Sequence, residues 1–416
     1  MRAFEIIIEA NKAKPKRPNP VAKHVNATVG GGGAGQHPDR KKRAQAGYQK
    51  HKGRMDEAKQ VGREFNHLED FVFTEPTDGA LKAVKIIRDM EQDASDVAIK
   101  WDGNPTVYWG RDDDGTFRMV GKNNWGKEEG KSSSAGELEK FILSRGKGED
   151  WRPKFAKDMA DLWPIFEKAT PPDFRGYVYG DLLYHPGKPY SGSDGYIRFT
   201  PNQTTYDVKV DSNIGRRIAK SKVAVTAHST YEYFGDKSGK PIQDVEQFSG
   251  NPELVVIGQT YVSKAPAVDA ENIEKVEALA NKYQPIIAKF FEPVAGLADL
   301  QDIFYRFMNS MSRAKQLDNL GTQSFENWVA GEGKISQGKQ AKVQEKIQAN
   351  PGAVEGIFTL ISEIMKAKNE IISDLDSAEA DVTATTGGKP GGEGYVKLRD
   401  KAKLVPRDRW TPFKSD

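Results

Sequence analysis

The stretch Val97-Ala98-Ile99-Lys100-Trp101-Asp102-Gly103 decides the fold of this chain and carries its sharpest chemical feature. Its three apolar residues indicate a buried strand over 96–100, and the Asp-Gly pair that follows is a turn signal. The strand therefore ends at a lysine, whose unprotonated amine is a nucleophile. Gly103 permits a tight turn beside a ligand. Taken alone, the same residues fit a solvated lysine before a hairpin turn equally well.

Short strand-like segments with turn signals between them follow this stretch. We expect strands at 105–110, 117–120, 177–184, 195–199, 204–210, 223–231 and 253–259. Apolar residues at helical spacing predict helices at 80–90, 136–144 and 155–168. Because the strands are short and closely spaced, the sequence predicts an α+β fold with a predominantly antiparallel sheet.

The second half of the chain is helical in character. Helices are expected near 270–291, 297–317, 323–348 and 352–378, followed by a loop rich in Gly and Thr at 383–392 and by strands at 395–398 and 403–405. The last strands are thus separated from the others by helical residues, which indicates an insertion. We expect a basic tail at 1–66, a core at 67–265, a helical insertion at 266–380, and strands that complete the core at 381–416.

The composition excludes several classes of protein. Of the 416 residues, 37% are hydrophobic and 29% charged, and no apolar run approaches the roughly 20 residues that a membrane-spanning helix needs. The N-terminus lacks the pattern of a secretory signal. The absence of cysteine excludes disulfides, thiolate metal sites and a cysteine nucleophile. We expect a cytoplasmic protein without a membrane partner, and the oligomeric state stays open.

Residues 11–64 have the composition of a disordered, basic tail. They contain 14 Lys and Arg residues against four Asp and Glu residues, with almost no large apolar side chains. Such a block suits a polyanion, because each neutralised phosphate releases counterions. Six side chains of this block are predicted to bind nucleic acid: Lys41, Lys42, Arg43, Lys50, Lys52 and Arg54. A solvated leader with no ligand is the alternative.

Three further segments join the Lys100 stretch in a recognisable order. Residues 177–184 have Asp181 in an apolar strand, Glu393-Gly394-Tyr395-Val396-Lys397 stands near the C-terminus, and Lys401-Ala402-Lys403 follows. Together they resemble the motifs of the superfamily of ATP-dependent polynucleotide ligases and mRNA-capping nucleotidyltransferases. The resemblance covers residues 67–265 and 381–416, and it implies an antiparallel-sheet nucleotidyltransferase core of the ligase adenylation (ATP-grasp-like) type.

The resemblance also implies roles for single residues. Lys100 would be the catalytic nucleophile that becomes linked to AMP, with ATP and Mg²⁺ as cofactors. Glu393 and Asp181 would hold metal. The nucleotide would be bound by both of these carboxylates and by Asp102, Gly103, Lys397, Lys401 and Lys403. Asp181 departs from the family, which usually has Glu there, and Lys397 lies four residues after Glu393, where many ligases place the lysine at five.

The implied activity is ligation of nucleic acid with a 5′-phosphate end through a lysyl-AMP intermediate. RNA is favoured over DNA, because the 13 residues after Lys403 do not accommodate the oligonucleotide-binding barrel of DNA ligases. Other details, such as residues 67–70, resemble nucleotidyltransferase-like proteins of myovirus-type bacteriophages, which would place the protein in an infected bacterial cytoplasm. Two alternatives remain: a catalytically silent nucleic-acid-binding or virion-associated protein, and an AMP transferase with another substrate.

Overall fold

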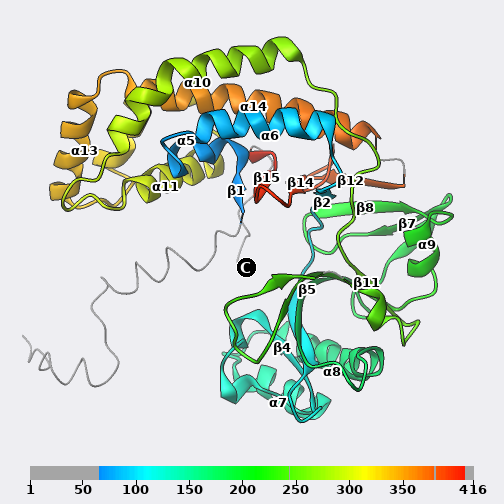
Figure 1. The fold of residues 1–416 in the computed structure, drawn as a ribbon. Helices are drawn as coiled ribbons and strands as arrows, with labels where there is room; N and C mark the ends of the chain where they lie inside the picture. The colour runs from blue at the N-terminus through cyan, green and yellow to red at the C-terminus, as the bar shows by residue number, and fades with distance from the viewer. Residues whose placement is uncertain (1–64, 243, 379–380, 408–416) are drawn as a thin grey trace, which may run out of the picture. The chain divides into compact units, whose positions relative to one another are not determined.

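Strand β2 (Val97–Ile99), which the sequence predicts to end at Lys100, belongs to a sheet whose strands come from distant parts of the sequence. The computed structural model describes residues 65–242, 244–378 and 381–407. Within them the strand order of this sheet is β1-β15-β14-β2, with β1 at Asn66–His67, β14 at Tyr395–Lys397 and β15 at Ala402–Leu404. β14 pairs antiparallel with β2 and β15, whereas β1 runs parallel to β15. The sheet therefore brings the residues after Ile99 beside those around Glu393 (Figure 1).

The second sheet is the largest in the described part of the chain. Its strands are β3 (Thr106–Arg111), β4 (Phe117–Gly121), β5 (Gly176–Tyr184), β9 (Val223–Tyr231), β10 (Lys240–Pro241) and β11 (Leu254–Ile257). They lie in the order β10-β9-β5-β3-β4, and β11 runs parallel to β9. Helices α7 (Ala135–Ser144) and α8 (Arg152–Ala169) share a hydrophobic core with this sheet, in which Phe166 meets Trp109 edge to face.

The third sheet joins the middle of the chain to its C-terminal part. Its order is β13-β12-β8-β7-β6, with β6 at Ser191–Ser193, β7 at Tyr196–Phe199, β8 at Thr204–Lys209, β12 at Val382–Thr386 and β13 at Lys389–Pro390. β12 pairs antiparallel with β8 along its whole length. Most strand pairs in the three sheets are antiparallel, so the predicted α+β class with antiparallel-rich sheets is confirmed.

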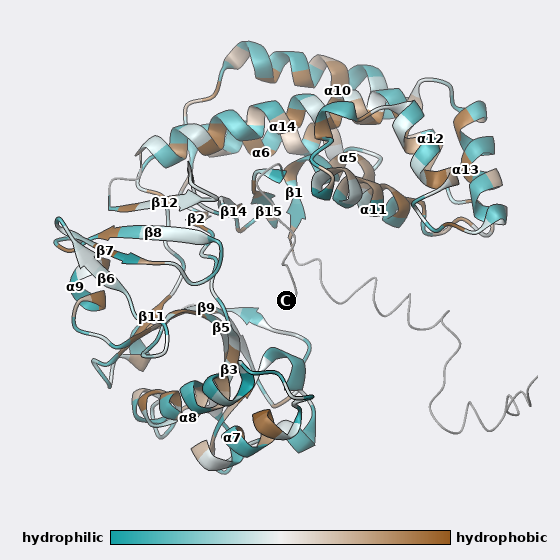
Figure 2. Cartoon of the chain, turned by 180° about the vertical axis from the view of Figure 1, so that it is seen from behind, coloured by the Kyte–Doolittle hydropathy of each residue, from teal (hydrophilic) through white to brown (hydrophobic). Residues whose placement is uncertain are grey.

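The remaining helices are mostly amphipathic. They are α5 (Phe71–Thr74), α6 (Gly79–Gln92), α9 (Asn213–Ile218), α10 (Ala270–Phe291), α11 (Leu300–Arg313), α12 (Thr322–Ala330), α13 (Gln337–Ala349) and α14 (Ala353–Ala378). In α14 the buried residues Val354, Ile357 and Ile361 recur at intervals of three and four, so one face packs against α10 and α6. Figure 2 shows apolar and polar residues alternating around these helices.

One hydrophobic core unites helices from both sides of residue 265. It contains Leu68 and the buried face of α6, the inner faces of α10 to α14, and Tyr395, Ala402 and Leu404 from the first sheet. The predicted boundary at residue 265 divides α6 from the helices of the expected insertion. The apolar side chains pack differently, because the buried face of α6 is covered by the later helices.

Three segments differ from the sequence expectation. The expected loop at 383–392 contains β12, because its β-branched threonines can pair with the free edge of β8. The expected helix at 323–348 is two helices, α12 and α13, which are separated by a turn that contains Gly331 and Gly333. The short helix α9 was not expected, and its start is capped by Ser212, whose side chain accepts a hydrogen bond from the Gly215 backbone.

Across the described ranges, no helix is both long enough and apolar enough to cross a membrane.

Candidate active site

The turn after β2 is anchored by the buried side chain of Trp101. Its ring lies 4.8 Å from that of Tyr206, measured between centroids, and its Nε1 donates a hydrogen bond of 3.1 Å to Thr260 Oγ1. A buried indole with a satisfied N–H fixes the backbone around it. The neighbouring residues Lys100 and Asp102 are therefore held by a rigid turn.

Asp102 is positioned from two sides. Its backbone N–H donates to the Tyr206 hydroxyl at 2.6 Å, and its Oδ1 accepts a hydrogen bond of 3.1 Å from Asn202 Nδ2. Both partners come from the region of the third sheet. The carboxylate is thus oriented before any ligand arrives, as catalytic side chains usually are.

Gly103 lies against β5 at the position of Asp181. A Cβ atom on Gly103 would stand 2.5 Å from the Asp181 Cβ and 2.9 Å from the Leu182 carbonyl oxygen, so only glycine fits. Asp181 accepts a hydrogen bond from Thr106 Oγ1, and its Oδ2 lies 3.0 Å from His228 Nε2. Burial raises the pKa of Asp181, but these contacts outweigh it, so the pKa is lowered and the carboxylate is ionised.

Lys100 and Glu393 form an ion pair across the first sheet. The Lys100 backbone N–H donates to the Gly394 carbonyl at 2.9 Å, which aligns the two segments. The side chains are 29% and 28% exposed, so the pair is open to solvent. Glu393 Oε2 contacts Lys100 Nζ but makes no aligned hydrogen bond. Burial raises the pKa of Glu393, and the Lys100 charge opposes this rise.

Gly394 is required by the close approach of two strands. Its φ of 116° lies in the left-handed region, and a Cβ atom there would stand 2.2 Å from the Leu404 carbonyl oxygen. The glycine lets the chain place Glu393 beside Lys100 while β14 pairs with β15. A larger residue at this position would displace the carboxylate.

Lys403 lies beside this pair without a partner of its own. In the register of the first sheet it stands opposite Val396 and next to His67. No hydrogen bond or ion pair of its amine to a described residue is seen. Burial and the Lys100 charge lower the pKa of Lys403, and burial and nearby cations hold that of His67 well below its usual value. An unpaired, largely buried cation is costly unless an anion joins it.

Two cavities meet at Lys100. One, of about 310 Å³, has a polar and basic lining that includes His67, Glu393, Lys403 and Arg313. The other, of about 280 Å³, is lined by α14, β12 and the glycines at 391–394, and by the Tyr206 side chain. The first has the charge that phosphate needs, and the second has the mixed polar and apolar lining typical of a small-molecule site.

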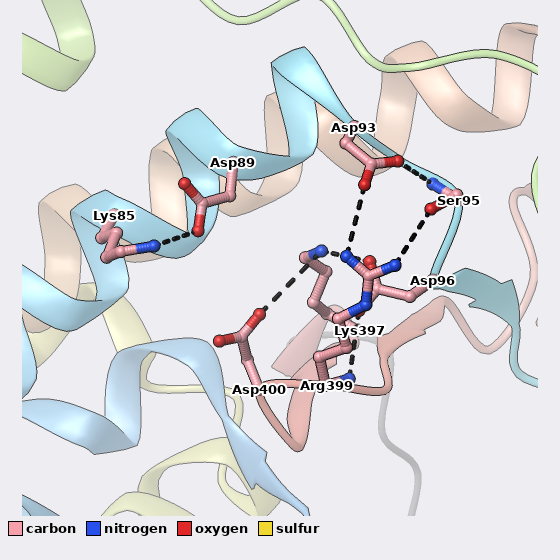
Figure 3. A network of polar contacts seen from close by, with 8 residues as sticks. All are labelled: Lys85, Asp89, Asp93, Ser95, Asp96, Lys397, Arg399 and Asp400. Carbon is pink, nitrogen blue, oxygen red and sulfur yellow. Dashed lines mark hydrogen bonds and ion pairs between the residues drawn. The ribbon is translucent and has the colours of Figure 1, made fainter.

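Lys397 and Lys401, which the sequence predicts to bind nucleotide, are not brought to Lys100. Side chains alternate along a strand, so Lys397 faces away from Val396 and Lys403. It is 3% exposed and forms an ion pair with Asp96 inside a polar network (Figure 3). Lys401 is exposed in the turn between β14 and β15, with a φ of 52°. Lys397 thus has a structural contact and Lys401 lies at the surface, and of these three lysines only Lys403 lines the cavity at Lys100.

Several residues at the site were not predicted. His67, Asn202, Tyr206 and His228 all contact or border the predicted group. None of the four lies in a motif that resembles the ligase superfamily, and each comes close to the predicted residues only through the pairing of strands or the loops between them. The six predicted nucleic-acid-binding residues between Lys41 and Arg54 lie outside the described residues.

The two carboxylates predicted to hold metal differ in what they offer. Both oxygens of Asp181 are already engaged, by Thr106 and His228, whereas Glu393 has its buried Oε2 against Lys100 Nζ and no contact of its Oε1 with a described residue is seen. The described residues contain no cluster of three potential metal ligands. Mg²⁺ is commonly held by one or two carboxylates together with substrate phosphates and water. Glu393 therefore fits such an ion, and Asp181 fits it less well.

The chain belongs to the family described as "Family of unknown function (DUF6267)", which matches residues 63–412. The comparisons with curated proteins and with solved structures gave no match. Because the family description names no activity, the function has to be argued from the chemistry of the site.

Proposed function

We propose that this protein is a nucleotidyltransferase in which Lys100 becomes covalently linked to AMP. The observation that carries the proposal is the meeting of Lys100, Glu393 and Lys403 at one basic cavity, with no described residue paired to the Lys403 amine. These residues come from distant parts of the described chain, and each lies in a sequence motif that resembles those of the ligase superfamily. A nucleophile, a carboxylate and an unpaired cation are the groups that phosphoryl transfer needs.

The proposed first step balances as follows. The unprotonated Nζ of Lys100 attacks the α-phosphorus of ATP, so an N–P bond forms and the bond from that phosphorus to the bridging oxygen breaks. Pyrophosphate leaves, and the amine proton passes to solvent. Lys403 stabilises the charge that develops on the phosphate oxygens, and its position in the basic cavity suits this role. Asp102, held by Tyr206 and Asn202, positions the nucleotide.

Mg²⁺, when bound, would neutralise charge on the phosphates, and Glu393 would hold it. The other residues act without it. Gly103 allows the nucleotide to approach the backbone beside β5. Asp181, paired with His228, contacts the ribose or orients the turn.

The second part of the proposal concerns the acceptor. AMP passes from Lys100 to the 5′-phosphate of a nucleic acid, forming a P–O–P bond as the N–P bond breaks. A 3′-hydroxyl then attacks the 5′-phosphorus, and AMP leaves as the phosphodiester forms. The protein is thus an ATP-dependent polynucleotide ligase, with RNA as the favoured substrate.

Incubation with ATP labelled at the α-phosphate tests the first step. After denaturing electrophoresis we expect a labelled band from the wild-type chain and none from Lys100→Arg, because arginine stays protonated and does not attack phosphorus. The phosphoramidate should be labile to acid and stable to base. Absence of label in the wild type would refute the nucleotidyltransferase. Release of the label by pyrophosphate but not by 5′-phosphorylated RNA or DNA would support nucleotidyltransferase activity and refute ligase activity.

A further inference from the structure

A further cavity, larger than the two that meet at Lys100, opens beside the site, and the chemistry proposed above does not use it. It is a groove of about 1000 Å³ between the start of β3, the end of β4, helices α7 and α8, and the turn after β5. Its lining extends from residues 104–106 to Trp151 and residues 185–188. We call it the α7–α8 groove.

The α7–α8 groove carries an excess of positive charge. Its charged side chains are Lys122, Arg145, Arg152, Lys154, Lys188 and Asp158. Arg152 pairs with Glu149, and Lys154 with Asp158. Among the described residues, no ion pair is seen for the other three basic side chains. Lys188 Nζ donates to the Pro201 carbonyl at 2.8 Å and Arg145 lies over the Phe141 ring, so these three cations have only neutral contacts in the groove, which suits a ligand with several negative charges.

An aromatic cluster lies at the far end of the groove. Trp151 is 54% exposed, a large exposed fraction for this residue type, and its ring packs edge to face on Phe155 at 5.7 Å. The Arg152 guanidinium covers it at 4.7 Å. A tryptophan that is held by neighbouring side chains and still 54% exposed leaves ring surface on which a flat ring can stack.

The near end of the groove reaches the site. Asn104 and Thr106, which line it, directly follow the Gly103 turn, and Thr106 donates a hydrogen bond to Asp181. Lys188 also lines it: burial lowers the pKa of Lys188, and the nearby Asp102 charge opposes this lowering only in part. A chain-like ligand in the groove would thus have one end beside Asp102.

We infer that the α7–α8 groove binds single-stranded nucleic acid, with a base stacked on Trp151 and phosphates on Lys122, Arg145 and Lys188. This inference rests on the proposed function, because it leads a strand towards the Lys100 site. Spaced cations combined with an exposed aromatic ring are the features by which proteins bind single strands without reading sequence. An acidic peptide would use the cations but would gain nothing from a stacking platform.

Binding of a fluorescein-labelled twelve-residue oligouridine to the full chain tests the inference by anisotropy. We expect Trp151→Ala to weaken binding about tenfold, the range found when one stacking residue is removed. A double variant, Lys122→Ala with Arg145→Ala, should lower the slope of log affinity against log salt by roughly 1.4, or about 0.7 for each phosphate contact. Any contribution from the basic N-terminal segment is common to all variants and leaves these differences unchanged.

Matched controls separate the groove from the surface in general. Tyr233→Ala removes another exposed aromatic ring, and Lys157→Ala removes a cation from α8, both outside the groove lining. Both should bind as the wild type does. Binding of a perfectly paired duplex should be insensitive to Trp151→Ala, because its bases are not free to stack on protein.

The outcomes are distinct. Wild-type affinity in both groove variants would overturn the inference, and so would polyglutamate that competes as well as oligouridine does. Labelling of Lys100 by ATP should survive in Trp151→Ala. If labelling is absent from the wild type but groove binding behaves as expected, the proposed function fails and the groove stands. If labelling is present and the groove variants bind as the wild type does, the groove inference fails and the proposed function stands.

Discussion

Two groups of charged residues in this protein resemble each other in composition and differ in how fully they are satisfied. The first, which we call the buried network, consists of Lys368, Glu69, Arg407 and Asp70. Lys368 donates to both Glu69 oxygens at 2.9 and 2.8 Å and to the Val405 carbonyl, and every side chain in the network is at most 2% exposed. It joins the N-terminal part of the core to α14 and to the C-terminal segment.

The second group is Lys100 with Glu393 and Lys403. Here the carboxylate makes no aligned hydrogen bond, Lys403 has no partner among the described residues, and two cavities adjoin the pair. The comparison teaches that a lysine saturated by protein groups holds the fold, whereas a lysine left short of partners beside a cavity is available to a ligand. In the buried network only Asp70 Oδ2 lacks a hydrogen bond.

The sharpest test of this contrast is the same substitution at the two lysines. Lys100→Met should abolish ATP labelling, by more than about 1000-fold as for the loss of a nucleophile, and should change the free energy of unfolding by less than about 0.5 kcal/mol. Lys368→Met should leave the labelling of the folded protein unchanged and should lower its free energy of unfolding. It leaves the charge of Glu69 without its main partner, at a cost of about 3–5 kcal/mol. Urea denaturation and labelling of both variants check this, and equal stability of the two would break the comparison.

Glu393→Ala should lower the labelling rate by about 100-fold, because it removes the carboxylate that is proposed to hold metal and that contacts Lys100. Since the Glu393 side chain is partly exposed, the loss of stability should be small. Glu393→Gln, which keeps the shape and loses the charge, is the matched control and should be impaired to a similar degree. An unchanged rate at saturating Mg²⁺ in both variants would show that Glu393 has no part in transfer.

The next test compares two lysines that lie on opposite faces of one hairpin. Lys403→Ala should raise the KM for ATP about tenfold, the effect of losing one charge-assisted contact to phosphate, and should also slow the labelling step, because Lys403 stabilises the charge that develops there; the free energy of unfolding should change little. Lys397→Ala leaves Asp96 buried without its cation, so it should destabilise the fold, while the folded fraction labels normally. Steady-state labelling kinetics together with thermal melts decide it. A matching rise in KM for Lys397→Ala would return that residue to the nucleotide site.

The smallest expected effect is a pH dependence inside the buried network. Burial raises the pKa of Asp70 from its ordinary value to about 6. The folded state therefore holds this proton more tightly, and the stability that this gives below about pH 4 is lost as the pH rises through about 6. Asp70→Asn has no carboxyl group that titrates at this position, so its free energy of unfolding relative to that of the wild type should increase between pH 4.5 and 7. A pH-independent difference in urea denaturation would contradict this.

The sequence predicted most of the fold because strands such as 223–231 and helices such as 270–291 carry their own apolar period. It also predicted the residues of the site that lie within motifs, among them Lys100, Asp102 and Glu393. It failed where a tertiary partner decides the outcome. β12 forms because β8 offers an edge, and Lys397 turns away because of strand register.

Other residues of the site lie outside every motif that resembles those of the ligase superfamily. His67, Tyr206 and His228 are single polar or aromatic residues in ordinary strands, and only their pairing partners bring them to Lys100. The buried network shows the same limit, since its members come from opposite ends of the described chain. Local pattern specifies elements, and the pairing of elements specifies the site.

The pairing of β2 with β14 also sets the order of events during synthesis. The Lys100 backbone is held by Gly394, so the site closes only after the ribosome has added roughly 300 residues beyond Lys100, which at 5–20 residues per second takes about 15–60 s. Until then β2 lacks its pairing partner β14, and Lys100 has neither Glu393 nor Lys403 beside it. Under the proposed function, a nascent chain should not become linked to AMP until its C-terminal strands have been made.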